Sequence, residues 1–177
     1  MSETSQATAQ SAVAPGAQTA EEIGRAYFQA VTDRDPERMA TFWAPDGIED
    51  IVPLGIFRGP DEVKRLFTEM FAAIPDSRMT VTRITASDRV AVVEWRFEGE
   101  FTGGSFQGIE PTGGYVQLRG ADCIEVEDGR IVRNTANYDG MAFARSIGMM
   151  PPMDSPAERA MKKAFNLVTR VRRAFGR

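Results

Sequence analysis

Residues 114–138 read GYVQLRGADCIEVEDGRIVRNTANY, and this stretch decides the class of fold. Two runs of alternating apolar and polar residues flank Asp128-Gly129, a dipeptide that is typical of a tight hairpin turn. The pattern therefore predicts two antiparallel strands, over 114–127 and 130–138.

The segments before this hairpin are helical first and strand-like afterwards. Thr19 and Glu22 form a capping box that opens a helix. Pro60 opens a second helix, whose apolar residues recur every three or four positions until Pro75. In chain order, the other predicted elements are a short helix from Asp35, a strand over 47–57, strands over 78–86 and 89–102, and a short helix over 139–148.

Helices followed by an antiparallel meander predict an α+β domain. We expect a cone-shaped α+β barrel, in which a curved antiparallel sheet packs against the N-terminal helices around a ligand cavity. This domain should span residues 19–150. Residues 1–18 are rich in Ser, Thr, Ala and Gln, which predicts a disordered tail, and residues 151–177 are predicted to include a basic amphipathic helix.

The composition excludes several kinds of chemistry. The 177 residues contain no histidine and one cysteine, Cys123, which excludes imidazole-dependent triads and most zinc sites. We expect no metal and no cofactor, and acid–base chemistry from carboxylates or tyrosine. Residues 158–177 carry a charge of +6 and the remainder −10, an acidic balance that argues against nucleic-acid binding. The lack of a secretory signal, of a membrane-length apolar run and of a cysteine pair predicts a cytoplasmic protein.

Two carboxylates fall on apolar strand faces. Because successive strand residues point to opposite faces, Asp122 lies among the apolar side chains of strand 114–127. The same rule places Asp50 beside apolar residues and turns Glu49 away from them, while Tyr27 lies on the inward side of the first helix. A buried carboxylate must be partnered or protonated. These residues therefore indicate a cavity for proton transfer, or alternatively a capping acid and an acid solvated through a bulge.

A second group of charges alternates along strand 89–102, on the face opposite Trp95. Arg96 and Glu98 belong to this group, which is typical of a solvated or subunit-facing surface. Asp139 follows the last strand and is placed to cap the next helix.

Several motifs together resemble a known family. They are Trp95-Arg96-Phe97-Glu98-Gly99, Arg119-Gly120-Ala121-Asp122, Glu127-Asp128-Gly129-Arg130-Ile131 and Asn137-Tyr138-Asp139. These residues resemble the SnoaL-like polyketide cyclases, which share a superfamily with nuclear transport factor 2, ketosteroid isomerase and limonene epoxide hydrolase. The resemblance covers residues 20–150 and implies the cone-shaped fold and a homodimer.

The resemblance also implies roles for individual residues. Similarity to ketosteroid isomerase implies Asp50 as the base and Tyr27 and a protonated Asp122 as hydrogen-bond donors. Similarity to the SnoaL-like cyclases implies Asp139 as an acid–base residue. Limonene epoxide hydrolase implies a different set, Arg96, Glu98 and Asp139, which would activate water.

We therefore expect an enzyme that performs isomerisation or intramolecular aldol cyclisation on a bulky apolar carbonyl compound, such as a polyketide or steroid. The alternatives are an epoxide hydrolase and a non-catalytic module that binds a hydrophobic ligand. The C-terminal helix is expected to pack on the acidic body of its own or a neighbouring subunit, or else to make weak contact with a membrane surface.

Overall fold

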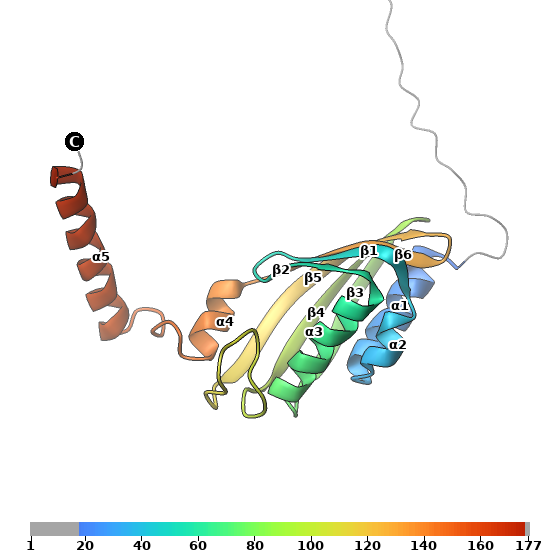
Figure 1. Cartoon of the computed structure of the whole chain (residues 1–177), viewed down its shortest axis with the longest axis horizontal. Coiled ribbons are helices and arrows are strands. Elements are labelled where there is room, and N and C mark those ends of the chain that lie inside the picture. Colours follow the sequence, from blue (N-terminus) through green and yellow to red (C-terminus); the bar gives the residue numbers. More distant parts are fainter. Residues whose placement is uncertain (1–17, 176–177) are drawn as a thin grey trace, which may run out of the picture.

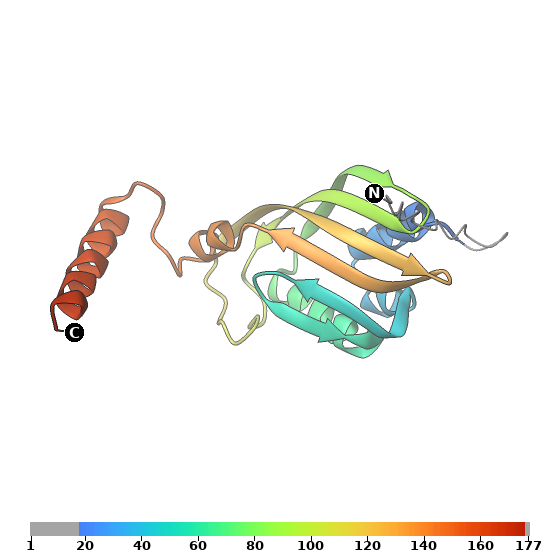
Figure 2. The same ribbon diagram turned by 90° about the horizontal axis from the view of Figure 1, so that it is seen from above.

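The computed structural model describes residues 18–175, and its centre is one six-stranded sheet (Figures 1 and 2). The strand order is β2-β1-β6-β5-β4-β3. All neighbouring strands pair antiparallel except β1 and β6, which are parallel. The strands are β1 (Trp43–Ile51), β2 (Gly55–Arg58), β3 (Arg78–Ala86), β4 (Val90–Glu100), β5 (Tyr115–Glu127) and β6 (Arg130–Tyr138).

Three helices cover one face of the sheet (Figure 1). They are α1 (Ala20–Thr32), α2 (Pro36–Ala40) and α3 (Gly59–Ala73). The predicted capping box is present at the start of α1, where the side chains of Thr19 and Glu22 each accept a backbone N–H from the other residue. Two further helices, α4 (Gly140–Ser146) and α5 (Pro156–Phe175), follow the last strand. The predicted α+β class with a curved sheet and covering helices is confirmed, although the sheet does not close.

The core lies between α1–α3 and the concave face of the sheet. Alternation holds along the two longest strands: Val93, Trp95 and Phe97 of β4 are buried, and so are Val116 and Ile124 of β5. The turn between β5 and β6 takes positive φ at Asp128 (49°) and Gly129 (72°), as the hairpin signal predicts. None of the helices within residues 18–175 combines the length and low polarity that spanning a bilayer requires.

The strand predicted over 47–57 is wrong in its extent. Strand β1 begins at Trp43 and ends at Ile51, the chain turns, and β2 returns beside it. The pairing of β1 with β6 also shifts register between Trp43 and Ile48. A turn and a register shift both interrupt the alternation of inward and outward side chains. A count that runs straight through 47–57 therefore exchanges the inward and outward residues of β1. The tail predicted over 1–18 lies, except for its last residue, outside the described residues.

A close backbone approach joins the loop after β4 to the end of α3. Gly103 donates its N–H to the Ala73 carbonyl at 2.9 Å, and Gly104 donates to the Ala72 carbonyl at 3.0 Å. These bonds satisfy carbonyls that the last turn of a helix leaves without partners. A Cβ atom on Gly103 would lie 1.9 Å from the Ala72 oxygen, so this position requires glycine.

Candidate active site

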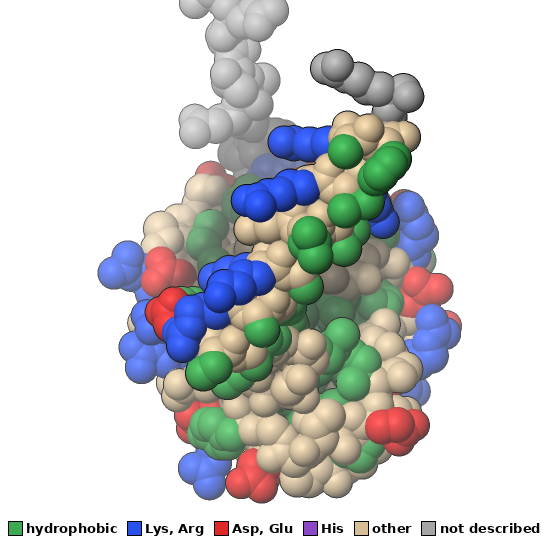
Figure 3. Space-filling view, turned by 90° about the vertical axis from the view of Figure 1, so that its left-hand side faces the viewer, with side chains coloured by type: hydrophobic (Ala, Val, Ile, Leu, Met, Phe, Trp, Pro, Cys, Tyr) green, Lys and Arg blue, Asp and Glu red, His purple; other side chains and the backbone are tan. Residues whose placement is uncertain are grey.

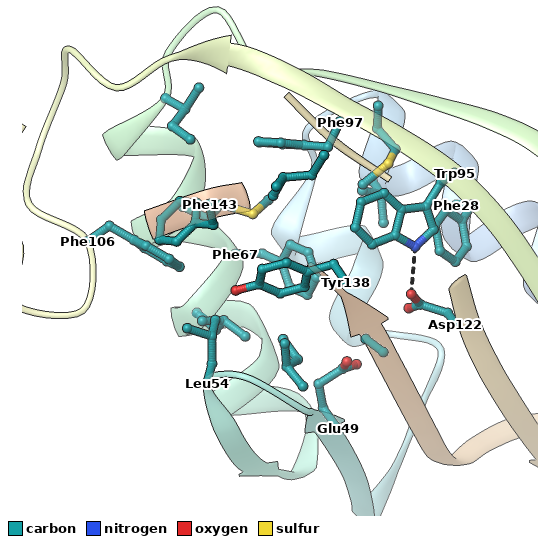
Figure 4. A pocket seen from close by; sticks show the side chains of 18 of the residues that line it. Phe28, Glu49, Leu54, Phe67, Trp95, Phe97, Phe106, Asp122, Tyr138 and Phe143 are labelled. Carbon is teal, nitrogen blue, oxygen red and sulfur yellow. Dashed lines mark hydrogen bonds between the residues drawn. The ribbon is translucent and has the colours of Figure 1, made fainter. Parts of the chain in front are cut away.

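An apolar cavity of about 90 Å³ lies between the sheet and the helices (Figure 4). Two carboxylates, Glu49 from β1 and Asp122 from β5, interrupt its apolar wall. Aromatic residues supply much of the rest, and they are Tyr27, Phe28, Phe67, Trp95, Phe97, Phe106, Tyr138 and Phe143. Within residues 18–175 no group of three or more His, Cys, Asp or Glu side chains is arranged to hold a metal ion.

Asp122 is held by two N–H donors. Trp95 Nε1 donates to Asp122 Oδ1 at 2.7 Å (Figure 4), and Asn134 Nδ2 donates to Asp122 Oδ2 at 2.5 Å. Asp122 is 6% exposed. The sequence prediction that Asp122 lies on the apolar face of its strand is therefore confirmed.

The indole reaches Asp122 because residue 120 has no side chain. Trp95 lies directly across the β4–β5 pair from Gly120, two residues before Asp122 on the same strand face. A Cβ atom on Gly120 would lie 2.3 Å from Trp95 Cζ2 and 2.6 Å from the Asn137 carbonyl oxygen. Glycine at this position leaves the space in which the indole ring lies.

Glu49 is the second buried acid, and it contacts the same asparagine. Its carboxylate is 1% exposed and accepts from Asn134 Nδ2 at 3.1 Å (Oε1) and 3.3 Å (Oε2). The sheet register explains the contact, since Glu49 is paired with Asn134 across the parallel β1–β6 pair. Asn134 therefore bridges two carboxylates from strands on either side of β6.

Burial changes the proton affinity of both acids. It raises the pKa of Asp122 to about 6, against the lowering effect of the bonds from Asn134 and Trp95. Burial also raises the pKa of Glu49 well above its ordinary value, and the charge of Asp122 raises it further. The two acids lie close enough to titrate as a coupled pair, in which the charge of one raises the pKa of the other.

Tyr27 completes the polar part of the cavity wall. It is fully buried in α1, and its hydroxyl has no hydrogen-bond partner among the described residues. Burial, followed by the charges of Glu49 and Asp122, raises the pKa of Tyr27 well above its usual value against the lowering effect of the nearby Trp43 side chain, so the hydroxyl stays protonated. Tyr27 therefore offers a hydrogen-bond donor to a ligand, and its predicted inward position is confirmed.

The predicted orientation of Asp50 is wrong. The inward residues of β1 are Gly47, Glu49 and Ile51, whereas Asp50 is half-exposed and does not line the cavity. The prediction counted the alternation of inward and outward residues through the turn to Leu54. Counted within Trp43–Ile51 alone, the alternation places Glu49 inward and Asp50 outward. The wall of the cavity thus holds Glu49 in the place expected for Asp50.

The other predicted site residues lie outside the cavity. Asp139 is exposed and caps α4, where its Oδ1 accepts from Met141 N at 2.9 Å and Ala142 N at 3.0 Å. Arg96 and Glu98 alternate with the inward residues of β4 and lie on the outer face of the sheet. The structure therefore does not bring Arg96, Glu98 and Asp139 together at the cavity, as the epoxide hydrolase alternative requires.

Sequence reasoning missed Glu49 and Asn134 as parts of the site. Alternation within β6 could have found Asn134, because it shares the strand face of Ala136 and Tyr138. The contact between Asn134 and Glu49 depends on the parallel β1–β6 pairing, which no local pattern predicts.

Stability should depend on pH through Asp122. The folded state holds this proton to about pH 6, whereas the unfolded chain releases it at the ordinary value of 3.8. The stabilisation from proton binding is thus complete below about pH 4 and is lost as pH rises through 6, a change of about 3 kcal/mol. The free energy of unfolding in urea should therefore fall by about that amount between pH 4 and pH 7 in the wild type but not in Asp122→Asn. Parallel stability curves for the two proteins would contradict the assignment.

Aromatic rings pack together at one end of the cavity, which we call its mouth. Phe106, from the loop after β4, packs edge-on against Phe143 of α4 with ring centroids 6.3 Å apart. Tyr138 packs on Phe143 in the same manner at 6.4 Å. Phe106 and Phe143 lie at the end of the cavity opposite Asp122, and Tyr138 lies between (Figure 4).

Comparison with solved structures finds the same fold in many chains. A candidate hydroxylase, AclR from Streptomyces galilaeus, is 19% identical, with a TM-score of 0.64 over 84% of this chain and 92% of its own. A candidate SnoaL-like polyketide cyclase from Jannaschia sp. CCS1 is 17% identical, with a TM-score of 0.65 over 77% and 99%. A protein with a ketosteroid isomerase-like fold from Catenulispora acidiphila is 18% identical, with a TM-score of 0.62 over 76% and 100%. At these identities the likeness shows the fold alone.

The sequence itself carries the family signature. A search of curated proteins found no match. The model of the SnoaL-like domain, however, matches residues 24–134, from α1 to the middle of β6. This match covers more than half of the chain and contains both acids, Trp95 and Asn134. The chain therefore belongs to the SnoaL-like domain family.

Proposed function

We propose that this protein is an acid–base enzyme that removes a proton next to the carbonyl group of an apolar substrate. One observation carries the proposal: two buried carboxylates are bridged by one amide in an apolar cavity, beside a tyrosine hydroxyl with no partner among the described residues. Buried acids with raised pKa values are typical of catalytic sites. Membership of the SnoaL-like family, with neighbours named as candidate polyketide cyclases, supports a cyclase or isomerase.

The hydrogen bonds favour different roles for the two acids. Asp122 accepts N–H bonds from Trp95 and Asn134, and such bonds stabilise the ionised form. Glu49 accepts only from the shared Asn134 amide, and burial and the charge of Asp122 raise its pKa well above the ordinary value, which suits it to the role of the acid. A base is most effective when its pKa lies near the working pH, which suits Asp122 at about 6.

The reaction then proceeds in two steps. Asp122 takes the proton from the carbon next to the carbonyl. The electron pair of that C–H bond forms a C=C bond, and the π pair of the carbonyl moves to its oxygen, which gives an enolate. The Glu49 carboxyl and the Tyr27 hydroxyl donate hydrogen bonds to this oxygen, at about 3 kcal/mol each. Asp122 then returns the proton to another carbon of a conjugated enolate, which is isomerisation, or to the alkoxide that forms when the enolate carbon attacks a second carbonyl, which is aldol cyclisation.

The cavity size bears on the substrate. At about 90 Å³ it accommodates one small ring, whereas sites for drug-sized ligands measure about 300–1,000 Å³. A bulky polyketide or steroid would place its reacting ring against Asp122 and displace Phe106 and Phe143 at the mouth. We therefore propose an apolar carbonyl compound whose remaining part extends through this mouth.

The proposal is tested by hydrogen–deuterium exchange. A panel of cyclic enones and 1,3-diketones is incubated with the protein in deuterated water, and exchange at the carbon next to the carbonyl is followed by NMR. We expect exchange above the buffer rate with at least one compound. Saturable binding of these compounds without any exchange would favour the alternative, a module that only binds hydrophobic ligands.

The pH dependence of this exchange should identify the base. The rate should rise with pH through about 6, as Asp122 loses its proton. Trp95→Phe removes the N–H bond to the ionised carboxylate, which raises the pKa of Asp122. The pH at which the exchange rate rises should therefore move up by about one unit. An unchanged pH of this rise in Trp95→Phe would show that another group is the base.

A further inference from the structure

The C-terminal helix α5 presents an apolar side that covers nothing. Its twenty residues include six basic ones, Arg159, Lys162, Lys163, Arg170, Arg172 and Arg173. Large apolar side chains recur at helical spacing on the side opposite five of these residues, with Arg172 among them, and they are Met161, Phe165, Val168, Val171 and Phe175. Phe165 is 70% exposed and Phe175 is 85% exposed. Figure 1 shows α5 projecting from one end of the domain.

The first turn of α5 is held to the preceding segment by contacts of Glu158. The same contacts pair the charge of this residue, which is the single acidic residue of the helix. Glu158 is buried and accepts from Arg145 of α4 at 3.0 Å and from the Asp154 backbone N–H at 2.9 Å. Lys162 lies 2.9 Å from its second oxygen. The remaining basic residues of α5 have no opposite charge within their own helix.

The open end of the domain is apolar as well. Val52 after β1, Met141 of α4, and Met149 and Met153 of the connector to α5 are exposed, Val52 by 59%. Gly140 packs against Pro53, which brings the turn after β1 beside α4. Figure 3 shows hydrophobic side chains on α5 and around a hollow behind it. The cavity mouth formed by Phe106 and Phe143 lies at this end.

We propose that α5 and this apolar rim (Val52, Met141, Met149 and Met153) dock on an anionic lipid bilayer. The apolar side of α5 would lie at the boundary of headgroups and acyl chains, with its basic residues among the headgroups. Charge complementarity favours this occupant, since residues 158–177 carry +6. The remaining residues carry −10, so an anionic surface repels the body and orients the helix end toward the lipid.

Docking in this orientation turns the cavity mouth toward the bilayer. An apolar substrate could then pass from the lipid to the cavity without crossing water. This second point rests on the proposed function, whereas binding of the lipid surface does not.

Vesicle flotation of the full chain tests the proposal. We expect the protein to float with vesicles of phosphatidylcholine containing roughly one-third phosphatidylglycerol, and to be released by high salt. The double substitution Arg170→Gln with Arg173→Gln should lower the partition coefficient about 30-fold. Phe165→Ser with Val168→Ser should lower it at least about tenfold. The matched control is Val92→Ser, an exposed apolar residue on the outer face of β4, which should leave it unchanged.

Two results would overturn the proposal. One is wild-type protein that stays unbound in the presence of anionic vesicles. The other is a change of molecular mass in light scattering when the α5 residues are substituted, with vesicle binding unaffected, because α5 would then bind a second copy of the chain. Glu49→Gln separates the two proposals: it should lose proton exchange and still float with the vesicles.

Discussion

Asp122→Asn is expected to lower the rate of proton exchange about 10³-fold, because asparagine cannot accept a proton at neutral pH. The exchange assay with the most reactive ketone of the panel gives the measurement. Asparagine keeps the size of the side chain and one acceptor oxygen for Trp95 Nε1 or Asn134 Nδ2. A circular-dichroism spectrum equal to that of the wild type would show that the loss is chemical.

The matched control is Asp50→Asn. Asp50 is next to Glu49 in the same strand, but it is half-exposed and does not line the cavity. Its substitution should leave the exchange rate unchanged, whereas Glu49→Gln should lower it about 10²-fold through the loss of an acidic donor to the enolate. Loss of activity in Asp50→Asn with retention in Asp122→Asn would reject the assignment.

Gly103→Ala is expected to destabilise the fold by about 3 kcal/mol. The new methyl group would lie 1.9 Å from the Ala72 carbonyl oxygen, which belongs to backbone and cannot turn away. Relief of this overlap requires moving the loop and breaking its two hydrogen bonds to the end of α3. Urea unfolding at constant pH measures the change.

Gly104→Ala provides the control for this substitution. Gly104 is exposed, and a Cβ atom there would meet no atom within 4 Å. We expect a change within about 0.5 kcal/mol. Equal effects at the two positions would mean that general loop stiffness, and not the contact with Ala72, determines stability.

The part of the fold that alternation governs could be predicted from the sequence. The β4–β5 pair has no register shift, and the β5–β6 pair has none between Gly120 and Glu125, so the inward orientation of Trp95 and Asp122 follows from period-two counting. The helices carry their own start signals, such as the Thr19 capping box.

The site could be predicted only in part, because its contacts are not local. Glu49 and Asn134 lie 85 residues apart and meet through a parallel strand pair, which local residue patterns do not specify. The prediction of side-chain orientation in β1 fails for a different reason. The strand ends at Ile51, but the turn that follows contains no glycine before Gly55 to mark where the strand stops. An error of one residue in counting the alternation then places Asp50 inward, where the structure has Glu49.

The glycine at position 120 has a consequence beyond packing. A relative with alanine there would have to rotate the indole of Trp95 or bend the strand, and either change would separate Nε1 from the Asp122 carboxylate. The acid strength of the cavity could thus diverge between homologues through a residue that never meets the substrate, while every ligand-facing side chain stays the same.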